Sequence, residues 1–217
     1  DSFQQCLSYV ELSNPAKGYI DKIITASGAL AGAALGFTLN YIHSKSKEST
    51  SEKNKIMCCK EDIHRVHAYL ARVMIDSVQM TSILINRRSL LDNNFVDFVS
   101  SLLLEKYYSE IAHRFTKNQR IWIQELISNL QIVNSKLLEF KKLTITGNTY
   151  QATLILFSLT DGAASCAHYC SMILSDTAHP QPPTVEMLRY YNIESSLIED
   201  HLLAKSNAQH GNKEFNL

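Results

Sequence analysis

Residues 23–42 form a twenty-residue segment without a formal charge, and this segment constrains the fold of the chain more than any other feature. Gly28, Gly32 and Gly36 recur every four residues within it, separated by alanine and leucine. As a helix, twenty residues match the thickness of the hydrocarbon core of a membrane. The spacing also places the glycines along one stripe of the helix, where a second helix can approach closely.

The same segment is only moderately apolar. Its glycines and threonines, together with Ser27, Asn40 and Tyr41, offset its leucines, isoleucines and Phe37. We estimate a free energy of insertion of roughly zero for this helix alone, so a partner helix would favour insertion. The pattern therefore predicts membrane association with self-association through a glycine zipper. The alternatives are a helix buried in the core of a soluble protein and a helix that inserts only conditionally.

Residues 44–60 form a charged, serine-containing stretch directly after the apolar segment. Five lysines outnumber two glutamates in it: Lys45, Lys47, Lys53, Lys55 and Lys60 against Glu48 and Glu52. This composition predicts a linker or a solvated helical extension. If residues 23–42 span a membrane, the lysine excess places the following domain in the cytoplasm.

The overall composition excludes several classes of protein. A hydrophobic share of 45% indicates a folded chain rather than a disordered one. Lys+Arg and Asp+Glu both number 21, and a chain with no basic excess is unlike a general nucleic-acid-binding protein. Only seven glycines and four prolines interrupt long segments rich in good helix formers, which predicts an all-α fold.

Breaks in the helical periodicity divide the chain into five parts. Residues 1–18 are predicted to be a polar lead that ends in a turn, 19–43 the apolar glycine-striped helix, 44–60 the connector, 61–205 a bundle of about five helices, and 206–217 a frayed tail. The predicted architecture is therefore an amphipathic helical bundle preceded by a Gly/Ala-rich apolar helix.

Apolar residues three and four positions apart predict the first three helices of the bundle. The first helix is marked by Ile63, Val66, Leu70, Val73, Ser77, Met80 and Leu84. The second, from a turn at 92–94 to about Lys117, is marked by Phe95, Phe98, Val99, Leu102, Leu103 and Ile111. The third follows a weak break at 116–120 and is marked by Ile123, Leu126, Ile127, Leu130, Val133, Leu137 and Phe140.

Residues 149–175 form a second apolar stretch, in which Asp161 and His168 are ionisable. Because an ionisable residue at mid-bilayer is costly, we predict the most buried helix of the bundle here, with a kink at Asp161 and Gly162, rather than a second span. A proline loop follows, and Thr184 is predicted to cap a last helix that runs to about Ala204.

The densest group of ligand-type residues is Asp161, Cys166, His168 and Cys170. Cys166 and Cys170 are about one helical turn apart and share a face. A zinc site usually combines Cys-x-x-Cys with a distant second pair, and this chain has neither. Because cysteine is often buried, core packing is the plainer interpretation, and a metal or redox site is the alternative.

Two Glu-x-x-His pairs, Glu61–His64 and Glu110–His113, have the spacing with which four-helix carboxylate proteins bind two metal ions. If the first two helices form an antiparallel hairpin that turns near Asn93, the two pairs differ in height by roughly 18 Å. We therefore interpret both pairs as surface charges.

Five cysteines without a framework spacing argue against a disulfide-stapled secreted module. Cys58 and Cys59 are adjacent and lie close after the apolar segment, where reversible lipidation would strengthen a marginal anchor. Two ordinary thiols in a linker are the alternative interpretation.

The chain contains no Gly-x-Ser-x-Gly elbow, P-loop, dinucleotide fingerprint or His-Glu-x-x-His motif. The sequence predicts a non-enzymatic, membrane-associated interaction or scaffold subunit without a cofactor, whose partners are other proteins and membrane lipid. One alternative is a membrane-inserting toxin or pore component, in which the bundle hides residues 23–42 until release. Another is a soluble all-α adaptor with the apolar helix in its core, and a soluble enzyme or metal protein ranks last.

Overall fold

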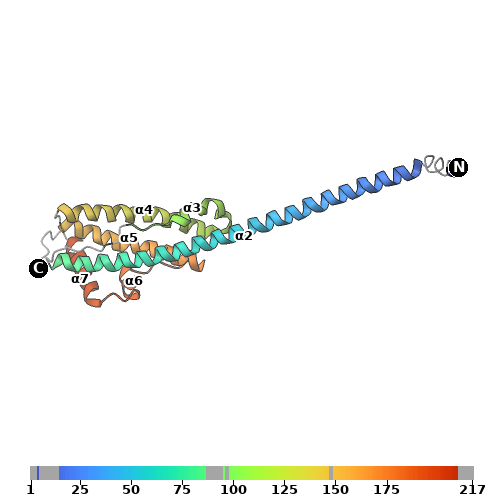
Figure 1. Cartoon of the computed structure of the whole chain (residues 1–217). Helices are drawn as coiled ribbons and strands as arrows, with labels where there is room; N and C mark the ends of the chain where they lie inside the picture. The colour runs from blue at the N-terminus through green and yellow to red at the C-terminus, as the bar shows by residue number, and fades with distance from the viewer. Residues whose placement is uncertain (1–3, 5–14, 87–94, 96–97, 147–148, 210–217) are drawn as a thin grey trace. The chain divides into compact units, whose positions relative to one another are not determined.

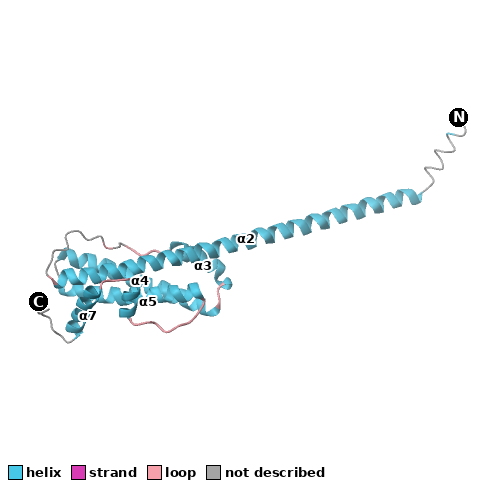
Figure 2. Ribbon diagram, turned by 90° about the horizontal axis from the view of Figure 1, so that it is seen from below, coloured by secondary structure: helices cyan, strands magenta, loops and turns pink. Residues whose placement is uncertain are grey.

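The computed structural model describes residues 4, 15–86, 95, 98–146 and 149–209 of the chain. The regular elements of these residues are all helices, and no strand occurs among them, which confirms the all-α prediction (Figures 1 and 2). The chain divides into two compact units, Asp1–Lys53 and Asn54–Leu217.

The first unit contains the N-terminal part of helix α2 (Pro15–Ile85). Residues 15–18, predicted as the end of a turn, are helical instead, because a proline is tolerated in the first turn, where its missing N–H would be unpaired anyway. The rest of the predicted lead lies outside the described residues apart from Gln4. Residues 44–60, predicted as a linker or a helical extension, are helical and continue α2.

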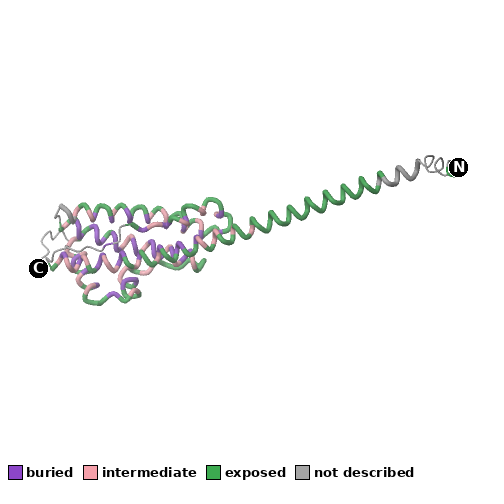
Figure 3. The backbone as a smooth tube through the Cα atoms, in the orientation of Figure 1, coloured by how far each residue is buried: buried purple, intermediate pink, exposed green. Residues whose placement is uncertain are grey.

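The second unit holds the hydrophobic core, formed by the C-terminal part of α2 together with α3 (Leu102–Ile111), α4 (Lys117–Thr146), α5 (Thr149–Ser175), α6 (Thr184–Tyr190) and α7 (Ser195–Gln209). A short 3-10 helix, η1 (Ala112–Arg114), follows α3. Helices α4 and α5 lie side by side as an antiparallel pair (Figure 1). Figure 3 shows the buried residues concentrated in this unit.

Helical periodicity predicts the core faces of α2 and α4 well. In α2 the predicted positions Ile63, Val66 and Leu70 are fully buried, and only Met80 is merely half-buried. All seven predicted positions of α4 face the core, with Ile127 half-buried and the other six buried. A 3.6-residue repeat fixes which side chains share one face of a helix, so long regular helices follow it.

Helix α5 is the most buried helix, as predicted, with more than half of its 27 residues buried. It forms one helix through Asp161 and Gly162, the position of the predicted kink. Gly162 also contacts the neighbouring helix, since a Cβ atom at this position would lie 3.2 Å from Val133 Cγ2 of α4. Close packing of the two helices requires a small residue here.

The predicted second helix is wrong over its first part, because residues 98–101 are not helical and α3 begins at Leu102. The Asn134 side chain holds this segment from α4. Its Oδ1 accepts a hydrogen bond from the Val99 N–H at 2.8 Å, and its Nδ2 donates to the Val99 carbonyl at 2.9 Å. These bonds take the place of helical ones at Val99, and the predicted core positions Phe98 and Leu102 are exposed.

The predicted last helix is two helices, α6 and α7, separated by a turn in which Asn192 has a φ of 55°. Thr184 does not cap α6, since its hydroxyl donates to Asp161 Oδ1 at 3.0 Å and Pro183 occupies the N-cap position. Helix α7 continues to Gln209, beyond the start of the predicted tail at residue 206. Residues 210–217 lie outside the described part of the chain.

Candidate functional site

The apolar segment of α2 exposes large hydrophobic side chains to solvent. Every described residue from 24 to 48 is exposed (Figure 3). Seven large side chains in this stretch have exposed fractions between 58% and 78%: Ile24, Leu30, Leu35, Phe37, Leu39, Tyr41 and Ile42. Soluble monomers rarely expose a contiguous apolar surface of this kind, which usually marks a protein or membrane contact.

The three glycines of the stripe contact no neighbour among the described residues. A Cβ atom added to Gly28, Gly32 or Gly36 would meet nothing within 4 Å. They differ in this from Gly162, whose lack of a side chain is explained by packing inside the bundle. Within the described part of the chain the stripe is therefore an open surface.

Polar groups within the segment are bonded inside the helix. The Thr38 hydroxyl donates to the Ala34 carbonyl at 2.7 Å, and the Ser27 hydroxyl donates to the Ile24 carbonyl at 3.1 Å. Hydroxyls that bond their own helix in this way need no water. Ser27 and Thr38 thus make the segment less polar than its composition indicates.

By length and composition α2 is capable of crossing a membrane, and residues 24–85 contain an 18-residue stretch with a mean hydropathy of 1.2. However, 39% of that stretch is buried, whereas residues 24–48 are all exposed. The stretch therefore lies in the part of α2 that belongs to the bundle core, and a core helix meets the same criterion. Residues 24–42 differ from this core part of α2 in their complete exposure to solvent, and not in their hydropathy.

The two cysteines predicted as lipidation sites differ in accessibility. Cys59 is buried with its Sγ 3.8 Å from the Leu103 carbonyl oxygen, and burial, with Asp62 and Cys58 nearby, raises the pKa of its thiol to about 11. Cys58 is half-buried. Because acyl transfer needs an accessible thiolate, Cys58 is the better placed of the two.

The structure does not bring Asp161, Cys166, His168 and Cys170 into one site. Cys166 and Cys170 are buried in the core, and burial raises the pKa of both thiols, that of Cys166 to about 12. Asp161 instead pairs with Lys205 Nζ at 2.5 Å. Within the described ranges no group of three or more His, Cys, Asp or Glu residues is arranged to hold a metal ion.

Both Glu-x-x-His pairs lie on the surface of the second unit. Glu61, His64, Glu110 and His113 are all exposed. Glu110 Oε2 pairs with Lys55 Nζ at 2.5 Å. The surface-charge interpretation agrees with these positions.

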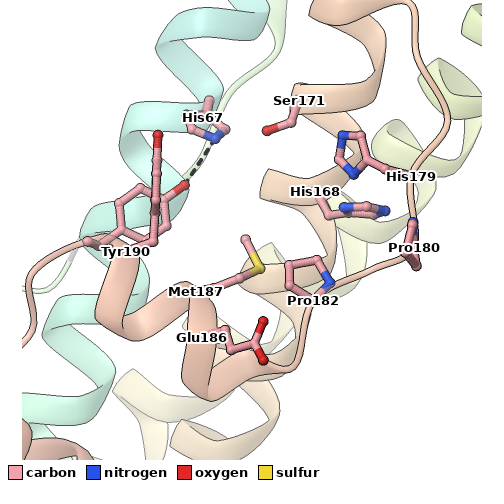
Figure 4. A pocket seen from close by; sticks show the side chains of 10 residues that line it. His67, His168, Ser171, His179, Pro180, Pro182, Glu186, Met187 and Tyr190 are labelled. Carbon is pink, nitrogen blue, oxygen red and sulfur yellow. Dashed lines mark hydrogen bonds between the residues drawn. The ribbon is translucent and has the colours of Figure 1, made fainter.

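The structure contains a cavity of about 450 Å³ in the second unit that the sequence does not reveal (Figure 4). Its walls come from α2, α5, the segment before α6, and α6 with the residue after it: His67, His168, Ser171, His179, Pro180, Pro182, Glu186, Met187, Tyr190 and Tyr191. Figure 4 shows His168 and His179 on one side of the cavity and His67 with Tyr190 on the other.

Two contacts define the polar side of this cavity. His67 Nε2 lies 3.0 Å from the Tyr191 hydroxyl, and the rings of His168 and His179 meet edge to face with centroids 4.8 Å apart. Burial lowers the pKa of His67, assisted by His64, and burial also lowers the pKa of His168, assisted by His179. Burial raises the pKa of Tyr191 to about 12. At neutral pH these three side chains are therefore uncharged.

No protein-family model, curated protein or solved structure matches this chain.

Proposed function

We propose that this protein is a non-enzymatic, membrane-associated interaction subunit. Lipid and a second helix cover residues 24–42, and the bundle lies in the cytoplasm and binds other proteins. The observation that carries this proposal is the exposure of seven large apolar side chains on a segment with no formal charge. A helix that is apolar all round is stable only when something apolar covers it.

The free energy of covering this surface is substantial. Transfer of one large apolar side chain out of water contributes about 1.5–3 kcal/mol, and seven such side chains point into solvent. Lipid provides this environment on all sides at once, whereas a single partner helix covers only one face. Since Ser27 and Thr38 bond within the helix, few polar groups oppose the transfer.

The C-terminal border of the segment has the residues expected at a membrane surface. Lys45 Nζ lies 5.8 Å from the centre of the Tyr41 ring. Tyrosine prefers the headgroup region, and a lysine beside it can direct its ammonium into water. The lysine excess in residues 44–60 then supports a cytoplasmic bundle.

The open glycine stripe supports a second copy of the same helix as the partner. Gly28, Gly32 and Gly36 present a smooth, self-complementary surface, and two such stripes allow close backbone contact. A helix of marginal hydropathy gains the dispersion energy that insertion alone does not supply.

Fractionation of cells that express the chain, followed by alkaline carbonate extraction of the membranes, tests the membrane assignment. We expect the protein in the extracted pellet. Leu35→Arg should move it to the soluble fraction, because arginine at a helix centre opposes insertion by about 2.5–3.5 kcal/mol.

Met57→Arg is the matched control, since Met57 is an exposed apolar residue of the same helix outside the segment, and it should leave the protein in the pellet. Complete recovery of the unaltered chain in the soluble fraction would contradict the proposal. Dye release from liposomes would then separate a conditionally inserting protein from a soluble adaptor.

A further inference from the structure

The cavity of the second unit has the size of a small-molecule site. Its volume of about 450 Å³ falls within the range of roughly 300–1,000 Å³ found for ligand pockets. It is built from side chains of α2, α5 and α6 that are far apart in sequence, so the folded bundle forms it in advance of any ligand. This site is separate from the apolar segment and does not depend on the proposed membrane role.

The apolar part of the cavity lining consists of prolines, tyrosines and a methionine. Pro180 and Pro182 restrict the backbone on one side. The rings of Tyr190 and Tyr191 meet at 81° with centroids 5.2 Å apart, so they present two nearly perpendicular ring surfaces. Met187, which is buried, adds a polarisable thioether that adapts to irregular shapes.

The charge of the lining favours a cation over an anion. Glu186 is the one acidic residue among the ten that line the cavity, and no lysine or arginine is among them. His67 and His168 are held neutral by burial, so they do not oppose a positive ligand and still offer nitrogen atoms for hydrogen bonds. A metal ion fits poorly, because the described residues hold no group of three suitable ligands.

We propose that this cavity binds a small organic cation, an ammonium group on an aromatic body, in which Glu186 pairs with the charge and Tyr190 and Tyr191 contact the ammonium and the ring. Tyrosine faces attract ammonium groups within about 6 Å of the ring centre. Glu186 and the two tyrosines line the same cavity, so one ligand can combine charge pairing with aromatic contact.

Isothermal titration of the purified full chain with benzyltrimethylammonium tests this assignment, because the probe has a permanent charge and an aromatic body. We expect saturable binding of one equivalent with a Kd below about 1 mM. Phenylmethanesulfonate, an anion of similar size, should bind at least about tenfold more weakly.

Glu186→Gln should weaken binding of the cation about tenfold or more without lowering the melting temperature, since Glu186 is exposed and not part of the core. Glu199→Gln, which removes an exposed glutamate of α7 outside the cavity, should leave the affinity unchanged. Absence of saturable binding at 10 mM probe (about ten times the upper Kd expected), equal affinity for the anion, or unchanged affinity in Glu186→Gln would each overturn the assignment.

Discussion

Among single residues, Asp62 shows how one helix of the bundle supports another. Its carboxylate is fully buried, and Oδ2 accepts hydrogen bonds from the N–H groups of Leu103 and Leu104, each at 2.9 Å. Oδ1 pairs with Arg65 one turn along α2. The N-cap residue of α3, Ser101, makes no capping bond of its own, so the cap of α3 comes from α2.

Replacing Asp62 with alanine should destabilise the bundle by about 2–4 kcal/mol, because two N–H groups lose their acceptor and Arg65 loses its partner. Urea unfolding followed by circular dichroism measures this change. Glu61→Ala, at the adjacent exposed position, should change the free energy of unfolding by less than about 0.5 kcal/mol. Equal effects of the two substitutions would contradict the capping role.

His201 makes stability depend on pH. The side chain is buried, with Nδ1 3.2 Å from Thr81 Oγ1 and its ring edge to face with Phe157. Burial, assisted by Lys205 and opposed by Asp161, lowers its pKa from 6.5 to about 4. The unfolded chain therefore binds a proton at a pH where the folded chain does not.

Stability should fall as the pH decreases from about 6.5 to about 4, by about 2–3 kcal/mol from His201, and this contribution should be constant above pH 7. His67 and His168 change in the same direction, because burial also lowers their pKa values. His201→Leu should reduce the slope of unfolding free energy against pH within this window. His113→Leu, at an exposed position, serves as the control, and an equal slope in both variants would refute the assignment.

At the scale of elements, the sequence predicts only a weak break at 116–120, whereas the structure has a capped helix start there. Thr116 and Gln119 form a capping box, in which the Gln119 N–H donates to Thr116 Oγ1 at 3.2 Å and the Thr116 N–H donates to Gln119 Oε1 at 3.1 Å. Gln119 Nε2 also donates to the Ile173 carbonyl near the end of α5 at 2.9 Å. The Thr-x-x-Gln pattern was a local signal for this helix start.

The apolar segment of α2 leads to a prediction about assembly. Gly32→Ile should convert the detergent-solubilised protein from an oligomer to a monomer, because the added side chain separates two glycine stripes. Light scattering coupled to size-exclusion chromatography measures the mass. Ala34→Ile adds the same bulk about 200° around the helix, away from the stripe, and should leave the mass unchanged. An unaltered mass in Gly32→Ile would refute association through the stripe.

At the scale of the whole molecule, the hydrophobic core belongs to the second unit. The first buried apolar residue in the described chain is Cys59, and the half-buried Ile56, also in the second unit, packs against the core just before it. A chain that starts at Asn54 should therefore fold to a helical protein with a melting temperature within about 5 °C of the full chain. It should also be soluble after cell fractionation. Loss of helical circular dichroism in this shortened chain would show that the first unit is needed for folding.

The all-α class, the core faces of α2 and α4, and the burial of α5 were all determined by the sequence. These features depend on the 3.6-residue repeat of a helix, which is local and present in every few residues. The prediction of the second helix is wrong at residues 98–101. There the side chain of Asn134, 35 positions away, bonds the backbone of Val99 and outweighs the local preference for a helix.

Only the tertiary structure decided which polar residues meet. Cys166, His168 and Cys170 lie close together in the sequence, yet the thiols are buried in the core while His168 faces the cavity. His67 and Tyr191 are 124 positions apart and lie within hydrogen-bond distance. Side chains that are neighbours in the sequence of one helix point in different directions. The packing of α2, α5 and α6 instead brings side chains from distant parts of the sequence to one cavity. No local pattern in the sequence encodes that packing.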